Sequence, residues 1–155
     1  NLKLGVKDEN IKEGITRIKS IARLQEIKSG KLKNICKDNR LYLDGSHNPL
    51  GARALNEYLN TLDCKKHLIL GMMSNKDHEE YISHFNNISS ITTIDIPNQP
   101  NAIKGEELKK KLNKYPNVSY KKSIEEALNS INPGKDDLIM ITGSLYLAGE
   151  LLNLN

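Results

Sequence analysis

The sequence has little of what several protein classes require. It contains no tryptophan, one phenylalanine and two cysteines, and aromatic residues make up only 5% of its 155 positions. A hydrophobic core must therefore be built mainly from isoleucine and leucine. The two cysteines, Cys36 and Cys64, have neither the spacing of metal ligands nor the number that a disulfide framework needs. We therefore expect reduced thiols in a cytoplasmic protein whose residues 1–155 form one domain.

Long apolar runs and nucleotide-binding motifs are also absent. No run approaches the roughly 20 residues of a membrane span, and the polar, charged first residues differ from a secretion signal. The sequence has no GxxxxGK(S/T) phosphate loop, no GxGxxG fingerprint and no GxSxG motif. These absences argue against a membrane partner, a self-sufficient nucleotide hydrolase, an NAD enzyme and a serine hydrolase. If the chain handles ATP, another domain must hold the triphosphate.

The charge balance is basic, with a formal net charge of +4 that comes from lysine. Such a balance can indicate nucleic-acid binding. The densest run, Lys109–Lys111, falls on the polar face of a predicted helix whose apolar stripe is Leu108, Leu112 and Tyr115. No aromatic residues interleave with the lysines as they do in RNA-binding motifs. We interpret the run as a solvated surface and do not expect a nucleic-acid partner.

From position 41 onward, apolar strand-like runs alternate with amphipathic helical segments. Runs that are apolar throughout predict strands buried on both faces, and therefore a parallel sheet with helices on both sides. The earlier segments 23–27 and 32–35 flank a Ser-Gly pair and predict a hairpin or two short strands at an antiparallel edge, and 8–20 has helical spacing. The predicted fold is α/β, a Rossmann-like three-layer domain. Strands are predicted at 41–44, 67–70, 91–96, 118–120 and 138–142.

The segment Leu41–Leu50 (LYLDGSHNPL) carries most of the functional signal. Leu41–Leu43 predict a buried strand, and Asn48 followed by Pro49 predicts a helix N-cap and first turn. Between them, Asp44–His47 place several polar groups in one strand-to-helix turn, beside a helix N-terminus that attracts anions. The alternative is a capped turn whose polar side chains only satisfy the backbone. The combination favours a functional site.

Polar turns marked by glycine or proline follow four of the predicted strands. They are Asp44–Asn48, Gly71–Asp77, Pro97–Ala102 and Gly143–Ser144. The carboxyl ends of parallel strands emerge at one edge of a sheet, and ligands bind in the crevice there. We therefore expect these four turns to meet at a single ligand site.

Four side chains in these turns are candidates for that site, together with Arg23, which begins the first extended segment, and each has a structural alternative. Asp44 can accept from a ribose or a cation or hold the imidazole, and His47 can donate to an anion or accept from an ammonium. Lys76 can meet a phosphate or be a solvated lysine. Ser144 can bind a carboxylate or only cap a helix, and Arg23 is an edge charge or a guanidinium directed at the site. No histidine or cysteine spacing indicates a metal site.

Several of these segments together resemble one family. They are Arg23–Gln25, Leu43–Pro49 (LDGSHNP), Gly71 with Lys76 and Asp77, and Thr142–Leu147 (TGSLYL). This pattern resembles the C-terminal domain of the folylpolyglutamate synthase/dihydrofolate synthase family, ATP-dependent amide ligases of the Mur ligase type. The family usually has Pro-Gly before this arginine, where the chain has Ile21-Ala22, and an acid is common at the position of Asn75.

The resemblance implies a Rossmann-like domain that packs beside an N-terminal P-loop ATPase domain, which this chain lacks. The implied reaction is driven by ATP and Mg²⁺. It joins L-glutamate to dihydropteroate or a folate through an acyl phosphate and releases ADP and phosphate. The isolated chain is expected to be inactive, because the phosphate loop and the metal ligands belong to the other domain.

The resemblance also assigns roles to the candidate residues. It implies that Arg23 and Asp44 contact ATP, that His47 and Ser144 orient the incoming glutamate, and that His47 and Asp44 are catalytic. Apart from the resemblance, Lys76 is a candidate phosphate contact, with a solvated lysine as the alternative. The alternative function is an orphan Rossmann-like module that binds a nucleotide or anion without catalysis.

Overall fold

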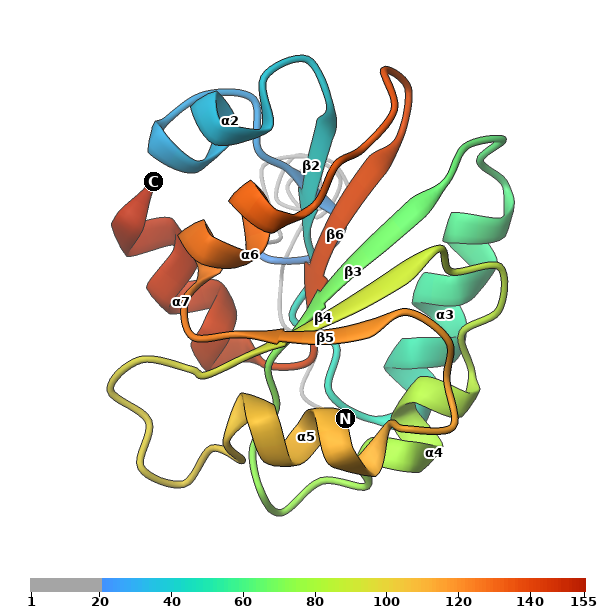
Figure 1. Cartoon of the computed structure of the whole chain (residues 1–155), viewed down its shortest axis with the longest axis vertical. Helices are drawn as coiled ribbons and strands as arrows, with labels where there is room; N and C mark the ends of the chain where they lie inside the picture. The colour runs from blue at the N-terminus through green and yellow to red at the C-terminus, as the bar shows by residue number, and fades with distance from the viewer. Residues whose placement is uncertain (1–20) are drawn as a thin grey trace, which may run out of the picture.

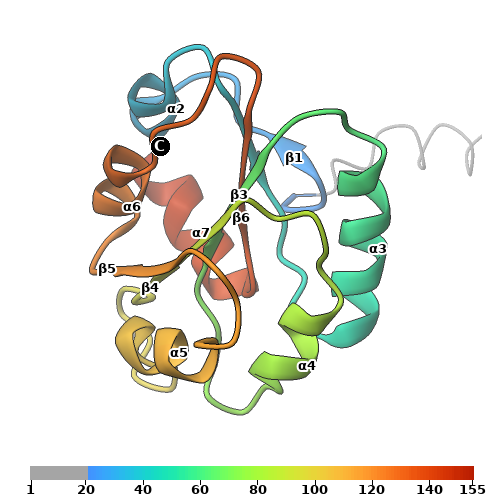
Figure 2. The same ribbon diagram turned by 45° about the vertical axis from the view of Figure 1, so that its right-hand side comes forward.

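In a computed structural model of the chain, residues 21–155 are described, and the helix predicted at 8–20 lies outside them. Residues 21–155 form a six-stranded sheet with the order β1-β2-β6-β3-β4-β5 (Figures 1 and 2). The strands are β1 (Gln25–Glu26), β2 (Arg40–Leu43), β3 (Lys66–Leu70), β4 (Ser90–Ile94), β5 (Val118–Lys121) and β6 (Leu138–Thr142). The helices are α2 (Lys31–Cys36), α3 (Pro49–Asn60), α4 (His78–Ser83), α5 (Gly105–Lys111), α6 (Ile124–Ser130) and α7 (Leu145–Leu154).

The sheet is parallel except at one edge. Strands β2, β6, β3, β4 and β5 all run in the same direction, whereas β1 pairs antiparallel with β2. Every residue of β3 and β6 is buried, as expected of central strands covered on both faces. The predicted α/β fold with one antiparallel edge is therefore confirmed.

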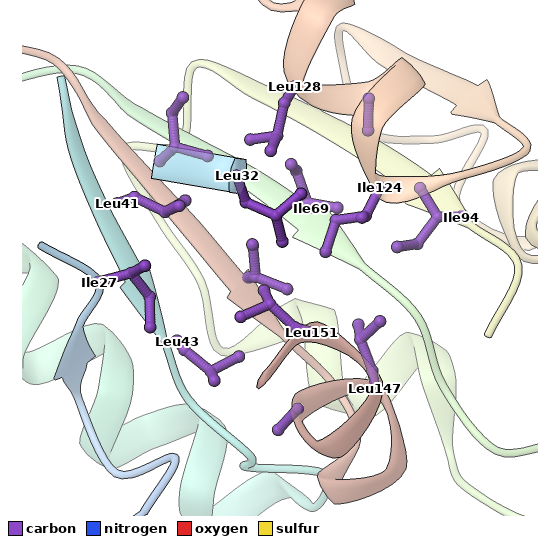
Figure 3. Close-up of a cluster of buried hydrophobic side chains, with 14 of the residues drawn as sticks. Ile27, Leu32, Leu41, Leu43, Ile69, Ile94, Ile124, Leu128, Leu147 and Leu151 are labelled. Carbon is purple, nitrogen blue, oxygen red and sulfur yellow. The ribbon is translucent and has the colours of Figure 1, made fainter. Parts of the chain in front are cut away.

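Helices cover both faces of this sheet, as Figures 1 and 2 show. One face packs against α2, α6 and α7, and the other against α3, α4 and α5. Figure 3 shows the first of these cores, in which side chains from α2, α6 and α7 meet β2, β3 and β4. Its labelled members are all isoleucine or leucine, as the shortage of aromatic residues predicted: Ile27, Leu32, Leu41, Leu43, Ile69, Ile94, Ile124, Leu128, Leu147 and Leu151. Within residues 21–155, no helix has the length and apolar character needed to cross a membrane.

One predicted element is wrong. The segment 32–35, expected as a strand, lies in helix α2, where Leu32 and Cys36 are buried at helical spacing. Gly30 turns the chain with φ of +105°, and the first N–H groups of α2 are satisfied from the far end of the chain. Lys31 N–H donates to Asn155 O (3.3 Å) and Leu32 N–H donates to Asn155 Oδ1 (3.0 Å). This long-range cap decides in favour of the helix.

The ends of β6 and β3 approach each other closely at Gly143. Its φ is +105°, and a Cβ at this position would lie 2.7 Å from Gly71 O and 2.7 Å from Leu70 Cδ1. Only glycine combines this backbone conformation with this contact. By contrast, a Cβ added at Gly149 in α7 would meet no atom within 4 Å.

We expect Gly143→Ala to lower the free energy of unfolding by about 2–4 kcal/mol, because left-handed strain and overpacking add. The matched control, Gly149→Ala on an open helix surface, should raise it by about 0.5–1 kcal/mol. Urea titrations of both variants measure the two changes. Equal effects would show that the approach at Gly143 is not constrained.

A polar cluster lies at the amino end of the strands, opposite to the end at which Gly143 lies. His67 Nε2 lies 3.3 Å from Asp137 Oδ2, and His67 Nδ1 lies 2.8 Å from Ser90 Oγ. Burial raises the pKa of the Asp137 carboxyl, but the hydrogen bond from Gly134 N–H and the neighbouring His67 outweigh it. The pKa of Asp137 therefore lies below its ordinary value. The cluster joins the starts of β3, β4 and β6.

Because that pKa is lower in the folded than in the unfolded chain, the Asp137 carboxylate stabilises the fold above about pH 4, and this is lost as the pH falls through the folded value. We expect Asp137→Asn to cost about 1–2 kcal/mol at pH 7. The difference from the unchanged chain should shrink below about pH 4. Denaturation curves from pH 3 to 7 test this, with Asp136→Asn, an exposed neighbour, as the control.

Candidate functional site

All four predicted turns contribute to one cavity at the carboxyl edge of the sheet. Its volume is about 650 Å³. The turn after β2 contributes His47, the turn after β6 contributes Ser144, and the loop after β3 contributes Lys76. The loop after β4 contributes Pro100 and Asn101. The remaining lining residues come from the loop after β3 and the start of α7: Met73, Ser74, Asn75, Leu145 and Tyr146. The structure therefore brings His47, Lys76 and Ser144 to one place.

A second cavity of about 470 Å³ adjoins the first, and His47 lines both. Arg23 and Asp44 line this second cavity and supply its charged groups. Its apolar wall consists of Leu24, Leu50, Ala54 and Leu55. The five candidate residues are thus divided between two neighbouring cavities that meet at the imidazole.

The Asp44 carboxylate ties the loop that carries Arg23 to the first turn. Its Oδ2 accepts from Leu24 N–H (2.9 Å) and its Oδ1 accepts from Ser46 N–H (2.8 Å). Gly45 N–H donates in turn to Ala22 O (2.8 Å). Asp44 is only 6% exposed, so these bonds form away from water. The side chain is a structural organiser as well as a lining residue.

Arg23 itself stands in an unusual backbone setting. Its neighbours Ala22 and Leu24 have φ values of 54° and 46°, in the left-handed region that glycine favours. Ala22 occupies the position at which the family that the sequence resembles usually has glycine, and its φ is positive although it carries a Cβ. The guanidinium is exposed, and its Nη1 lies 3.4 Å from Ala22 O and beside Gly45. Within residues 21–155 it forms no ion pair, although the Asp44 carboxylate lines the same cavity.

The orientation of His47 settles what its ring can do. Nδ1 lies 2.9 Å from Gly45 O. A carbonyl oxygen only accepts, so Nδ1 carries the proton. The described part of the chain offers Nε2 no hydrogen-bond partner, and in the neutral ring this nitrogen can only accept. The half-buried ring therefore presents an acceptor at the junction of the two cavities.

Ser144 begins helix α7 from beneath the first cavity. Its Oγ accepts from Tyr146 N–H (3.1 Å), which makes it the helix N-cap, and it is 2% exposed. Its hydroxyl proton has no acceptor among the residues that the structure describes. Asn48 has the predicted capping role for α3, because its Oδ1 accepts from Gly51 N–H (2.9 Å). The alternative of a cap is thus realised in both, and only Ser144 also lines the first cavity.

The wall that carries Lys76 is held by the neighbouring loop. Ser74 N–H donates to Asn101 O (2.9 Å), and Ile103 N–H donates to Met72 O (3.1 Å). The half-buried Lys76 side chain has no ion-pair partner among residues 21–155. Its ammonium group is therefore available to an anion in the cavity.

The sequence interpretation missed a cluster of buried hydroxyl groups under the site. Tyr81 Oη lies 2.9 Å from Ser46 Oγ and 2.8 Å from Thr142 Oγ1, and the two smaller hydroxyls are 3.2 Å apart. Burial raises the pKa of Tyr81 to about 12, against the opposing effect of its hydrogen bonds, so the phenol stays protonated. The available signal was a tyrosine on the inward face of a helix, whose hydroxyl needs a partner.

The site contains no metal-ligand set. Among residues 21–155, no three His, Cys, Asp or Glu side chains lie close enough together to hold a metal ion.

Comparison with known proteins identifies a family for this chain. Residues 23–145 match the family described as Mur ligase, glutamate ligase domain. A curated relative, folylpolyglutamate synthase of Lacticaseibacillus casei, is 29% identical over 154 residues, covering 92% of this chain and 31% of that protein.

Solved structures share the fold. Folylpolyglutamate synthase of Mycobacterium tuberculosis, complexed with ADP and AMPPCP, matches with a TM-score of 0.78 and 21% identity over 96% of this chain and 35% of that chain. A bifunctional folylpolyglutamate synthase/dihydrofolate synthase with Mn, AMPPNP and L-glutamate bound matches with a TM-score of 0.77 and 19% identity, over 97% and 35%.

The chain spans about a third of the length of these relatives. The family match covers most of the described residues and includes Arg23, Asp44, His47, Lys76 and Ser144. The chain belongs to the Mur ligase family, in which it represents the glutamate ligase domain.

Proposed function

We propose that this chain is the C-terminal domain of an ATP-dependent ligase that adds L-glutamate to dihydropteroate or a folate. It supplies one side of an active site whose other side is an N-terminal P-loop ATPase domain. The observation that carries the proposal is the pair of adjoining cavities, which share His47 and are lined by all the candidate residues. The family match and the folylpolyglutamate synthase relatives support the same reaction class.

The second cavity is the proposed nucleotide contact. The Arg23 side chain is exposed and forms no ion pair in the described part of the chain, which suits the negative charge of a polyphosphate. Each Asp44 oxygen accepts one backbone N–H and retains a lone pair for a ribose hydroxyl. The leucine-rich wall offers an apolar surface to the rest of the nucleoside.

The first cavity is the proposed glutamate contact. The His47 Nε2 lone pair can accept from the glutamate amine, because Nδ1 is already committed to Gly45 O. The Ser144 hydroxyl and the N-terminal turn of α7 can bind a glutamate carboxylate. Lys76 lies across the same cavity, where its ammonium can meet a phosphate group.

In the proposed reaction, the substrate carboxylate takes the γ-phosphate of ATP to give an acyl phosphate and ADP. The glutamate nitrogen then attacks the acyl carbon, loses a proton, and phosphate leaves as the amide forms. The contribution of this chain is positioning and charge stabilisation. We assign the Mg²⁺ ligands to the ATPase domain, since residues 21–155 hold no cluster for a metal.

Exposed apolar side chains around the cavities support the proposed partner domain. Leu50 is 69% exposed, Tyr146 56%, Leu145 47% and Leu24 36%, and all four line one of the two cavities. Apolar residues gathered at the rim of a polar site are typical of a surface that another part of the protein covers. With that cover absent, we expect the isolated chain to lack ligase activity.

The proposal is tested by mixing the chain with the ATPase domain and measuring ADP release with dihydropteroate or a folate plus L-glutamate. We expect ADP release only when both parts and glutamate are present. Calorimetry of the chain alone with ATP and with glutamate is the second arm. Micromolar ATP binding by the chain alone, without ligase activity in the mixture, would support the non-catalytic binding module instead.

His47→Ala in the assembled enzyme should reduce kcat/KM for L-glutamate by about 10²–10³-fold, because it removes the acceptor that orients the amine. The control is His84→Ala, which removes an imidazole from a residue that lines neither cavity. Steady-state ADP release at varied glutamate measures both. Full activity in His47→Ala would contradict the assigned role.

Arg23→Ala should raise KM for ATP by roughly 10-fold or more, since a charge-assisted contact to phosphate is lost. Arg53→Ala removes an equal charge from the exposed side of α3 and should leave KM for ATP unchanged. Repeating both assays at high salt separates direct contact from long-range attraction. An equal response of the two variants would reject a direct contact.

A further inference from the structure

The buried hydroxyl cluster of Ser46, Tyr81 and Thr142 joins the two turns that carry the groups proposed to hold glutamate. We infer that Tyr81 is a positioning residue that sets the separation of His47 and Ser144, and so the affinity for L-glutamate. This inference rests on the proposed function, and nothing in the family match assigns a role to Tyr81.

The hydrogen bonds of the Tyr81 hydroxyl join two turns that are distant in sequence. Tyr81 Oη lies 3.1 Å from Ser46 O, 2.9 Å from Ser46 Oγ and 2.8 Å from Thr142 Oγ1. Ser46 O also accepts from Gly143 N–H (3.1 Å). Ser46 directly precedes His47, and Thr142 and Gly143 directly precede Ser144. A single phenol oxygen therefore contacts the backbone or side chain next to both glutamate contacts.

Tyr81 itself lines neither of the proposed ligand cavities. It is also fully buried, so it cannot touch a ligand directly. Its ring packs against Phe85 with centroids 5.4 Å apart, which holds the phenol in place from below. Loss of the hydroxyl alone would leave this packing intact but would leave the small hydroxyls with fewer partners.

Helix α4, which carries Tyr81, also connects this cluster to the loop of Lys76, the third candidate residue of the first cavity. α4 begins directly after the loop of Lys76, and His78 Nε2 lies 3.0 Å from Met73 O in that loop. Asp77 Oδ1 caps the helix by accepting from Glu80 N–H (2.9 Å). Tyr81 therefore links helix α4 to the first and fourth turns, and the same helix is held to the second turn through His78.

The test is Tyr81→Phe in the assembled ligase, which keeps the ring and removes the hydroxyl. We expect KM for L-glutamate to rise about 10-fold, the value of one buried hydrogen bond, with KM for ATP changed by less than about twofold. The matched control is Thr93→Val. Thr93 is also fully buried and its Oγ1 lies 2.7 Å from Gly105 O, but neither Thr93 nor Gly105 lines either of the two cavities.

A second pair of variants covers the case in which Tyr81→Phe does not fold. Thr142→Val removes a hydroxyl from the same cluster and should raise KM for glutamate. Thr142→Ser keeps the hydroxyl and should leave KM for glutamate near the value of the unchanged enzyme. Amide hydrogen exchange on the 155-residue chain gives a readout without catalysis. The Gly143 amide, which bonds to Ser46 O, should exchange faster in Tyr81→Phe and not in Thr93→Val.

The outcomes separate the two proposals. An assembled enzyme with no ligase activity before mutation would overturn the proposed function and this inference with it. An active enzyme in which Tyr81→Phe leaves KM for glutamate unchanged would overturn only this inference. An equal rise in the two KM values, or the same rise in Thr93→Val, would also overturn it, because it would report general destabilisation.

Discussion

The structure depends on the parallel pairing of β6 between β2 and β3. This pairing places Leu43 opposite Ile141 and Leu70 opposite Thr142, so that the chain leaves three neighbouring strands at the same level. Gly143 N–H then reaches Ser46 O, and Gly71 N–H reaches Thr142 O at 3.3 Å. Polar turns separated by about a hundred residues in the sequence are thereby held within hydrogen-bonding distance. Every candidate ligand contact is attached to one of these turns or to the loop that Asp44 ties to them.

The two cavities divide the polar groups by the kind of bond that each can form. Around the second cavity, each oxygen of the Asp44 carboxylate accepts one backbone N–H, which ties the Arg23 loop to the first turn while the Arg23 side chain stays exposed. Around the first, His47 has one nitrogen committed and one open, and Ser144 uses its oxygen as a cap while its proton is unassigned. In a preorganised site of this kind, hydrogen bonds within the folded chain already orient the polar groups, so that less has to be ordered when a ligand binds.

Much of the fold could be predicted because local pattern and tertiary environment agree. The run at 138–142 is apolar throughout and becomes the central strand, and Asn48-Pro49 begin α3 with the predicted cap. The convergence of the turns followed from strand direction alone. The segment 32–35 could not be predicted in the same way. Its apolar residues Leu32 and Ile35, with Cys36 after them, have helical spacing, but a helix of six residues is short, and Asn155 supports it because its backbone and side-chain oxygens accept the first N–H groups of α2.

The sequence by itself determined the class of fold, the edge of the sheet at which the four polar turns meet and the residue types gathered there, because hydrophobic periodicity and turn residues act over short stretches of chain. Only the tertiary structure decided which atoms of those residues are free. The proton on His47 Nδ1, the two occupied oxygens of Asp44 and the phenol under Ser46 and Thr142 all depend on partners brought close by folding. A hydrogen bond needs its two atoms within about 3 Å and in line, and sequence spacing does not specify that geometry between distant segments.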